Sequence, residues 1–286
     1  MERTIFNLAF YLFFVSQPSW SVVGCPGSIH QDALSRLKEV EKASIVGPVD
    51  NRMTYETYAT KYGQSLSKVY SKFSAAGRMY CGDAMGSGQV TVSANVVTAS
   101  AHNFYDDNCK PRVSDFTKCF FLGVSEPSTV PVKYFVKSVE VGTTCPRDDP
   151  YIFDWAVVKL ERVVEGVRPL KIDSNCVLAP GLNGLHLAAT HNNFGDQRNP
   201  PRTVGYCQVM EAVNAIYRTN CSAGGGASGS AITCEKRDSL FLSGLMVAAQ
   251  TNPAADYKPY SHQNSNIVIP VNGNFLKAIE VAVLAK

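Results

Sequence analysis

The sequence has little net charge and no dense run of basic residues. Its 286 residues carry a formal net charge of +3 at pH 7, with 18% charged and 45% hydrophobic residues. A protein that binds nucleic acid through its phosphates needs a basic patch, so nothing here indicates a nucleic-acid partner. The hydrophobic fraction excludes a disordered chain and is sufficient for a large buried core.

Metal-binding patterns are also missing. No Cys-x-x-Cys pair occurs, and His191 and His262 have no neighbouring ligands at zinc spacing. The cysteines are instead dispersed along the chain, which is typical of disulfides in an exported protein. They are Cys25, Cys81, Cys109, Cys119, Cys145, Cys176, Cys207, Cys221 and Cys234. Their number is odd, so at least one thiol is free or bridged to another molecule.

One long apolar run is present, close to the N-terminus. It extends from Ile5 to Val15, about half the length of a membrane span, and is followed by the small residues Ser19 and Ser21. This pattern favours a signal peptide of residues 1–21 over a membrane anchor, and therefore a secreted or periplasmic protein. No later segment of the sequence is long and apolar enough to cross a membrane.

Helical periodicity is scarce. A short amphipathic pattern in residues 22–44 is interpreted as a pro-segment, and residues 55–73 predict a helix. The final segment, 272–286, predicts another helix, capped by Asn274. Most other apolar segments are short, rich in β-branched residues and separated by Gly, Pro, Asn and Asp. Many short strands without helices between them predict an all-β sandwich or barrels.

The segment CSAGGGASGSAITC places Ser228 among residues with almost no side chain, so the backbone there can approach a ligand closely. It contains no Gly-Lys-Ser/Thr for a phosphate loop, and Ser230 replaces the last glycine of the α/β-hydrolase elbow. Gly224-x-Gly226-x-x-Gly229 fits a dinucleotide fingerprint, but no strand–helix–strand unit surrounds it. Two interpretations of the segment remain: a glycine-rich surface turn, or a nucleophile beside backbone N–H donors.

Candidate partners for Ser228 are one histidine and one aspartate. A serine hydroxyl is a weak nucleophile unless a base removes its proton and a third group orients that base. His102 follows an apolar strand in VVTASAH, among alanines that leave room for an imidazole. Asp154 begins the apolar strand DWAVVKL, where an unpaired carboxylate would be unfavourable. Asp154 therefore needs a partner, whereas a lone histidine at position 102 is more often structural.

SAHNF, DWAVVKL and GASGS, in this order, resemble the His, Asp and Ser motifs of the trypsin/chymotrypsin-like serine proteases over roughly residues 75–286. Ser230, together with IVGPVDNR near residue 45, is more similar to the bacterial glutamyl-endopeptidase-like branch. The resemblance implies an all-β fold, with two six-stranded antiparallel β-barrels packed together and a C-terminal α-helix. The first barrel would occupy residues 45–165 and the second residues 166–286.

The resemblance also implies a secreted serine endopeptidase that forms an acyl-enzyme intermediate. His102 would be the general base, Asp154 would orient it, and Ser228 would attack the carbonyl carbon. The backbone N–H groups of Gly226 and Ser228 would form the oxyanion hole. No metal or other cofactor is implied, and the expected partners are a protein or peptide substrate and a protease inhibitor, with no nucleic acid and no membrane. The alternative is a catalytically silent homologue that acts as a binding module.

Some positions depart from the family pattern. Ser222, Met246 and Ala248 are the candidates for the substrate pocket. Ser222 takes the place of the pocket floor of trypsin-like enzymes, and because it has no charge, a preference for Arg or Lys is not expected. Met246 lies near where a glutamate-specific enzyme would have a histidine. Ala227 replaces the usual Asp or Asn, so activation by a freed Ile45 amine is not expected.

The cysteines carry three further expectations. Asn103 stands where the family has a cysteine, so Cys81 is expected to pair with Cys109 or Cys119. A disulfide between Cys207 and Cys221 is predicted at the entry to the glycine-rich segment, with Cys234 as the competing partner of Cys221. By analogy with chymotrypsin-like zymogens, a bond between Cys25 and Cys176 would tether the pro-segment.

Overall fold

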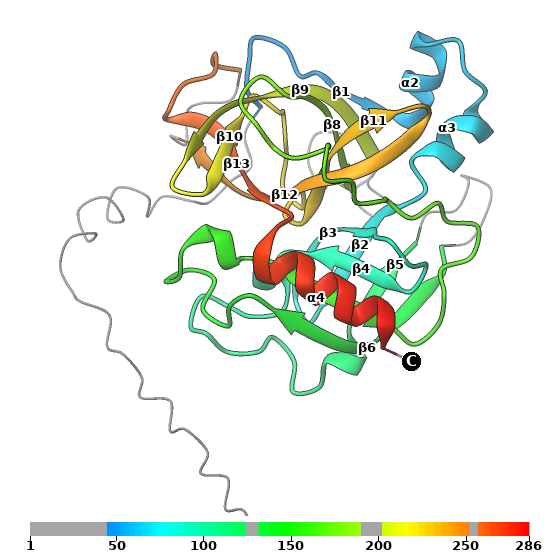
Figure 1. Ribbon diagram of the computed structural model, residues 1–286, viewed down its shortest axis with the longest axis vertical. Helices are drawn as coiled ribbons and strands as arrows, with labels where there is room; N and C mark the ends of the chain where they lie inside the picture. The colour runs from blue at the N-terminus through cyan, green and yellow to red at the C-terminus, as the bar shows by residue number, and fades with distance from the viewer. Residues whose placement is uncertain (1–44, 124–130, 190–201, 252–256, 286) are drawn as a thin grey trace, which may run out of the picture. The chain divides into compact units, whose positions relative to one another are not determined.

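The computed structural model describes residues 45–123, 131–189, 202–251 and 257–285. The expected signal peptide, the expected pro-segment with Cys25, and His191 lie outside these residues. The described part forms two closed antiparallel barrels of six strands each and a C-terminal helix (Figure 1). This confirms the predicted fold class.

The first barrel is closed in the order β2-β3-β4-β7-β6-β5. Its strands are β2 (Ala76–Cys81), β3 (Ala84–Val90), β4 (Val96–Ala99), β5 (Phe120–Leu122), β6 (Lys133–Val141) and β7 (Ala156–Leu160). Strand β6 alternates inward and exposed residues, as expected for a strand with one wet face. All residues of β4 and β7 are buried, because helix α4 (Gly273–Leu284) packs on the outer face of these strands.

The second barrel is formed by β8 (Asn183–Ala189), β9 (Arg202–Val213), β10 (Ile216–Thr219), β11 (Ser230–Lys236), β12 (Ser239–Thr251) and β13 (Asn264–Pro270). The sheet order runs β9-β10-β13-β12-β11-β8, and pairing between β8 and β9 closes it. A further short strand, β1 (Arg52–Thr54), pairs with the outer edge of β9. This N-terminal segment, which falls within the expected range of the first barrel, is therefore hydrogen-bonded to the second.

The segment expected to be one helix forms two, α2 (Tyr55–Lys61) and α3 (Leu66–Lys72). Gly63 adopts a φ of +60° between them, a conformation that interrupts a right-handed helix. The hydroxyl of Ser65 then caps α3 by accepting a hydrogen bond from the Lys68 N–H at 3.3 Å. The result is a helical pair that packs aromatic residues against the second barrel.

Helix α4 begins at Gly273, and Asn272 is its N-cap residue. The expected cap at Asn274 is therefore wrong by two positions. The buried face of the helix includes Phe275, whose ring stacks on Trp155 with centroids 5.3 Å apart. Because Trp155 directly follows Asp154 in the chain, this contact fixes the backbone beside that carboxylate.

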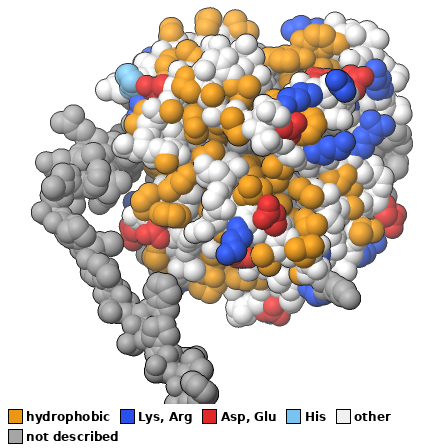
Figure 2. Space-filling model, in the orientation of Figure 1, with side chains coloured by type: hydrophobic (Ala, Val, Ile, Leu, Met, Phe, Trp, Pro, Cys, Tyr) orange, Lys and Arg blue, Asp and Glu red, His pale blue; other side chains and the backbone are white. Residues whose placement is uncertain are grey.

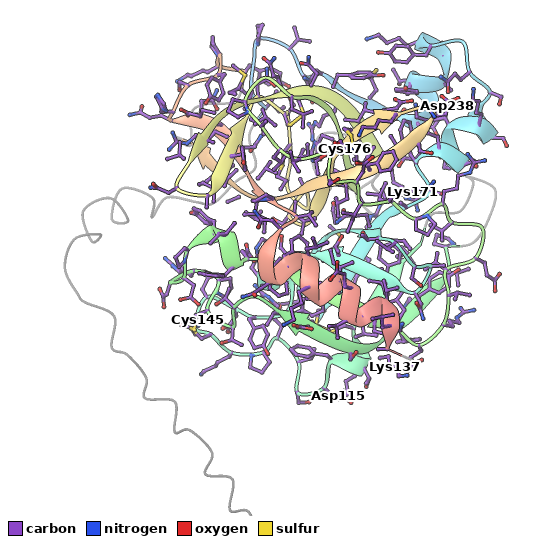
Figure 3. The ribbon with its side chains drawn as sticks, in the orientation of Figure 1. Asp115, Lys137, Cys145, Lys171, Cys176 and Asp238 are labelled. Carbon is purple, nitrogen blue, oxygen red and sulfur yellow. A yellow bond between two sulfur atoms is a disulfide. The ribbon has the colours of Figure 1, made fainter. Side chains whose placement is uncertain are left out.

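Four disulfides link the described cysteines: Cys81–Cys119, Cys109–Cys145, Cys176–Cys234 and Cys207–Cys221. The bond between Cys207 and Cys221 and the choice of Cys119 for Cys81 agree with the expectations. The expected tether from Cys25 to Cys176 is wrong, because Cys176 is bonded to Cys234. Figure 3 labels Cys145 and Cys176, which belong to two different bonds. Four disulfides are consistent with an oxidising, extracellular or periplasmic location.

Asn103 lies against Gly86 of β3, in a position where two larger side chains would not fit together. A Cβ added to Gly86 would lie 2.8 Å from the Asn103 side-chain carbon Cγ. The Asn103 side chain therefore fills the space next to Gly86, and Cys81 forms its disulfide with Cys119 instead.

The surface carries charges of both signs. On the face drawn in Figure 2, Lys and Arg side chains lie among Asp and Glu side chains. Two of the ion pairs are Lys72 with Glu235 at 2.7 Å and Lys236 with Asp173 at 3.1 Å. In the part of the chain that the structure describes, no helix combines the length and the hydropathy needed to span a membrane.

Candidate active site

His102 and Asp154 meet because their strands are neighbours. β4 pairs with β7 antiparallel, with Ala99 opposite Ala156. His102 follows β4 in a short 3₁₀ turn (Ala101–Asn103), and Asp154 precedes β7, so both residues emerge at the same end of the barrel. His102 Nδ1 lies 2.7 Å from Asp154 Oδ2, and the His102 backbone N–H donates to Asp154 Oδ1 at 3.0 Å. The carboxylate thus holds both the ring and the main chain of the histidine.

The electrostatic surroundings favour a basic imidazole. The Asp154 side chain is 4% exposed and that of His102 is 29% exposed. Burial lowers the pKa of His102, but the charge of Asp154 and its hydrogen bond outweigh this and leave the pKa above its ordinary value. Arg112 donates from Nε to the His102 carbonyl oxygen at 3.0 Å, and its positive charge opposes protonation of the ring. The ring is therefore oriented, partly open to solvent and able to accept a proton.

Ser228 lies in the loop between β10 and β11, and two glycines determine the shape of this loop. Gly226 and Gly229 have φ values of +86° and +83°, which favour glycine. A Cβ added to Gly229 would collide with the Ser87 carbonyl oxygen and lie 2.8 Å from the Ser100 amide nitrogen. The backbone directly after Ser228 therefore lies against the segment that leads to His102.

The N–H groups of this loop differ in whether they are paired. Ala227 donates to the Gly224 carbonyl oxygen at 3.0 Å, and Gly229 donates to the Met246 carbonyl oxygen at 2.7 Å. The N–H groups of Gly226 and Ser228 have no hydrogen-bond acceptor among the described residues. Two unpaired donors on alternate residues can bind the oxygen of a bound carbonyl.

The Ser228 side chain is partly exposed, and its hydroxyl makes no hydrogen bond to another described residue. The structure thus places Asp154 and His102 in direct contact, and brings Ser228 to the same region through the packing of Gly229. In proteins without bound substrate, the bond between nucleophile and base is often long and tightens only with substrate.

The three expected pocket residues have different surroundings. Ser222 is 1% exposed, and its hydroxyl donates to the Val46 carbonyl oxygen at 3.4 Å. Met246 is buried in an apolar cluster with Ala227, beneath the loop that carries Ser228. Ala248 is half-buried and packs against the larger core of the second barrel. Ser222 therefore lies in the loop itself and Met246 lies next to it, and their role as a pocket stays a prediction.

A small hollow of about 180 Å³ lies near Asp154 but is separate from this site. Its lining includes both neighbours of that residue, Phe153 and Trp155, together with Asn272 and Phe275. Neither His102 nor Ser228 belongs to the lining. Within the described ranges, no group of His, Cys, Asp and Glu side chains is arranged to hold a metal ion.

Two residues that support the loop were missed by the sequence interpretation. Ser87 hydrogen-bonds to the loop from β3, and His186 on β8 lies with Nε2 2.6 Å from Ser230 Oγ. A histidine within the apolar strand LHLAA was the available signal for His186. Ser87 gave none, because a serine between two glycines is common on a surface.

Comparison with known proteins supports the fold. Many solved chains are similar, and one of them is described as a Glu endopeptidase in complex with MPD. It matches with a TM-score of 0.63 and 14% sequence identity, covering 83% of this chain and 98% of that chain. No protein-family model matches the sequence, and no curated protein matches it significantly. The likeness shows that this protein has the chymotrypsin-like fold.

Proposed function

We propose that this protein is a serine endopeptidase in which Ser228, His102 and Asp154 form the catalytic triad. The observation that carries the proposal is the Asp154–His102 pair, held by two hydrogen bonds of 2.7 and 3.0 Å. It lies beside a glycine-rich serine loop in which two N–H donors have no acceptor among the described residues. A buried carboxylate that accepts from Nδ1 leaves Nε2 of the same ring available as a base.

The chemistry follows from these roles. Ser228 Oγ attacks the peptide carbonyl carbon while His102 Nε2 takes the hydroxyl proton, and the carbonyl oxygen becomes an oxyanion bound by the N–H groups of Gly226 and Ser228. The C–N bond then breaks, His102 returns the proton to the leaving amine, and an ester remains on Ser228. Water hydrolyses the ester by the same steps, and Asp154 stabilises the imidazolium each time. No metal or other cofactor takes part.

The substrate is a protein or peptide whose side chain before the scissile bond carries no positive charge. Ser222 at the proposed pocket floor has no carboxylate to bind Arg or Lys. Met246 and Ala248 are apolar, so the proposed pocket offers no cation for Glu either, although the similar solved structure is a Glu endopeptidase. A neutral residue is the best match to this composition.

The cellular setting of the proposal is an exported enzyme. The expected signal peptide, residues 1–21, and the four disulfides support secretion to the periplasm or the cell exterior. Residues 22–44 are a segment to be removed or held aside, without an Ile45 switch because Ala227 has no carboxylate. A protease inhibitor is the expected protein partner, and no nucleic acid or membrane is involved.

The proposal is tested by digestion of casein and of a peptide library with protein lacking residues 1–44. We expect the wild type to cleave internal peptide bonds and Ser228→Ala, matched in thermal unfolding, to be inactive. Mass spectrometry of the library products identifies the residue before each cut. Equal cleavage by both proteins would exclude Ser228 as the nucleophile. A folded wild type without any cleavage would favour the catalytically silent homologue.

A further inference from the structure

Ser87 lies in β3 of the first barrel and is fully buried, at 0% exposure. Its hydroxyl donates to the Gly226 carbonyl oxygen at 2.8 Å and accepts from the Ala189 N–H at 2.9 Å. Its own backbone N–H donates to the Ser228 carbonyl oxygen at 2.8 Å. One residue of the first barrel thus binds two carbonyl groups of the nucleophile loop and the end of β8 in the second barrel.

These bonds fix the peptide groups on either side of the Ser228 N–H. The peptide between Gly226 and Ala227 is held at its oxygen by Ser87 Oγ and at its N–H by the Gly224 carbonyl oxygen, 3.0 Å away. The peptide between Ser228 and Gly229 is held at its oxygen by the Ser87 N–H and at its N–H by Met246, at 2.7 Å. A planar peptide that is bonded at both ends cannot rotate without losing both bonds.

The peptide between these two contains the Ser228 N–H itself. Its carbonyl oxygen, on Ala227, accepts from the Ser230 N–H at 2.9 Å, so the Ser228 N–H is its one unpaired group within the described chain. The direction of that N–H therefore depends on its two neighbours. Of the four groups that hold those neighbours, the Ser87 hydroxyl is the only side chain.

We propose that the Ser87 hydroxyl is a positioning group for the oxyanion hole, which holds the loop so that the N–H group of Ser228 keeps a fixed direction. The inference rests on the proposed function. Donors that are already oriented stabilise a developing oxyanion without reorganisation, so a small rotation of the loop lowers the rate of the chemical step. Ser87 itself touches neither substrate nor the reacting atoms.

The direct test is Ser87→Ala, which removes the hydroxyl and keeps the backbone N–H that binds Ser228. We expect kcat per titrated active site to fall about tenfold, less than the roughly 10²–10³-fold loss of a direct donor, with KM changed less than about twofold. The matched control is Ser243→Ala. Ser243 is 3% exposed, and its hydroxyl has no partner among the described residues, so its removal should leave kcat within about twofold.

A second readout separates positioning from folding. A peptide boronate places an oxygen of its tetrahedral adduct at the proposed oxyanion hole, whereas a product peptide does not form that adduct. We expect Ser87→Ala to weaken the boronate about tenfold and the product peptide less than about twofold. If Ser87→Ala does not fold, Ser87→Cys keeps the volume with a weaker donor, and its kcat should fall in the same direction by a smaller factor.

The outcomes separate this inference from the function on which it rests. A wild type that the active-site titrant does not label refutes the proposed function, and the inference with it. A labelled wild type, with Ser87→Ala equal to it in kcat and in boronate affinity, overturns the role of Ser87 alone. The role of Ser87 is also overturned if Ser87→Ala lowers only the unfolding temperature, or if it weakens the binding of the boronate and of the product peptide equally.

Discussion

Two histidines of this protein each lie within hydrogen-bonding distance of a polar side chain, yet their pKa values move in opposite directions. His102, which is 29% exposed, has Asp154 at 2.7 Å, and that carboxylate outweighs burial and leaves the pKa of the ring above its ordinary value. His186 is 1% exposed and has Ser230 Oγ at 2.6 Å. Burial, followed by the charge of Arg52, lowers the pKa of His186 to about 4.

The difference shows that contact between a serine and a histidine does not make a catalytic pair. His186 lies 2.6 Å from a serine hydroxyl, but no carboxylate is bonded to its ring within the described residues. It stays neutral at physiological pH, and its ring lies within hydrogen-bonding distance of Ser230, the residue that directly follows the nucleophile loop. We therefore propose that His102 transfers the proton and that His186 supports the loop.

The largest expected effect contrasts the two rings directly. His102→Ala should lower kcat on a peptide substrate by about 10⁶-fold, the scale found when the base is removed from a serine protease. His186→Gln keeps a hydrogen-bonding amide and should lower kcat less than about tenfold, because we expect that ring to move no proton. Both are measured on protein with native circular dichroism. A loss of similar size in the two variants would contradict the assignment.

Removal of the charge that distinguishes the two sites should have the next largest effect. Asp154→Asn should lower kcat by about 10⁴-fold, as the same change does in a serine protease of this fold, because the amide favours the wrong imidazole tautomer. Asp106→Asn is the matched control, since that carboxylate accepts hydrogen bonds from the backbone N–H groups of Asn108 and Lys110 in its own loop. If Asp154→Asn kept more than a tenth of the wild-type kcat, the carboxylate would not be the orienting group.

The third prediction concerns the stability of the protein in acid, which should depend on the protonation of His186. The folded pKa of about 4 lies below the ordinary value of His, so the unfolded chain binds the proton more tightly. The contribution of neutral His186 to the free energy of unfolding is therefore complete above about pH 6.5. It is lost as the pH falls towards 4, by about 3 kcal/mol in total. Urea unfolding of the wild type and His186→Gln at several pH values isolates this term as their difference. A difference that does not change between pH 7 and pH 4 would show that His186 is not titrating.

The smallest effect concerns the pH dependence of the activity. Because Asp154 keeps the pKa of His102 above its ordinary value, kcat/KM should fall about tenfold per pH unit below a midpoint higher than about 6.5. In Asp154→Asn the residual activity should show this midpoint at lower pH, whereas His186→Gln should leave it unchanged. A shift of the midpoint in His186→Gln alone would mean that the two rings have the reverse roles.

The motifs predict the fold and the triad candidates, but not the supports of the loop. His102, Asp154 and Ser228 stand in short segments whose residues resemble one family, so their positions could be read locally. Ser87 contacts residues 139 and 102 positions away, and His186 contacts one 44 positions away. Such partners are set by how the barrels close, which no local pattern encodes.

Other errors had local causes. The single helix expected for residues 55–73 is two helices, because Gly63 interrupts an otherwise continuous apolar periodicity. The expected tether of Cys176 relied on a family analogy, whereas the fold places Cys176 beside Cys234. The pairing of Cys207 with Cys221 was predictable because Cys207 lies on a predicted strand and Cys221 at the entry to the glycine-rich segment, only 14 positions further along the chain.

The most direct test of the central claim is labelling with a fluorophosphonate probe, followed by peptide mapping of the modified residue. We expect one label per molecule on Ser228 and none on Ser230, although Ser230 Oγ lies 2.6 Å from His186 Nε2. The label should be lost in Ser228→Ala and His102→Ala and retained in His186→Gln. A folded wild type that takes up no probe, or takes it up on Ser230, would contradict the account.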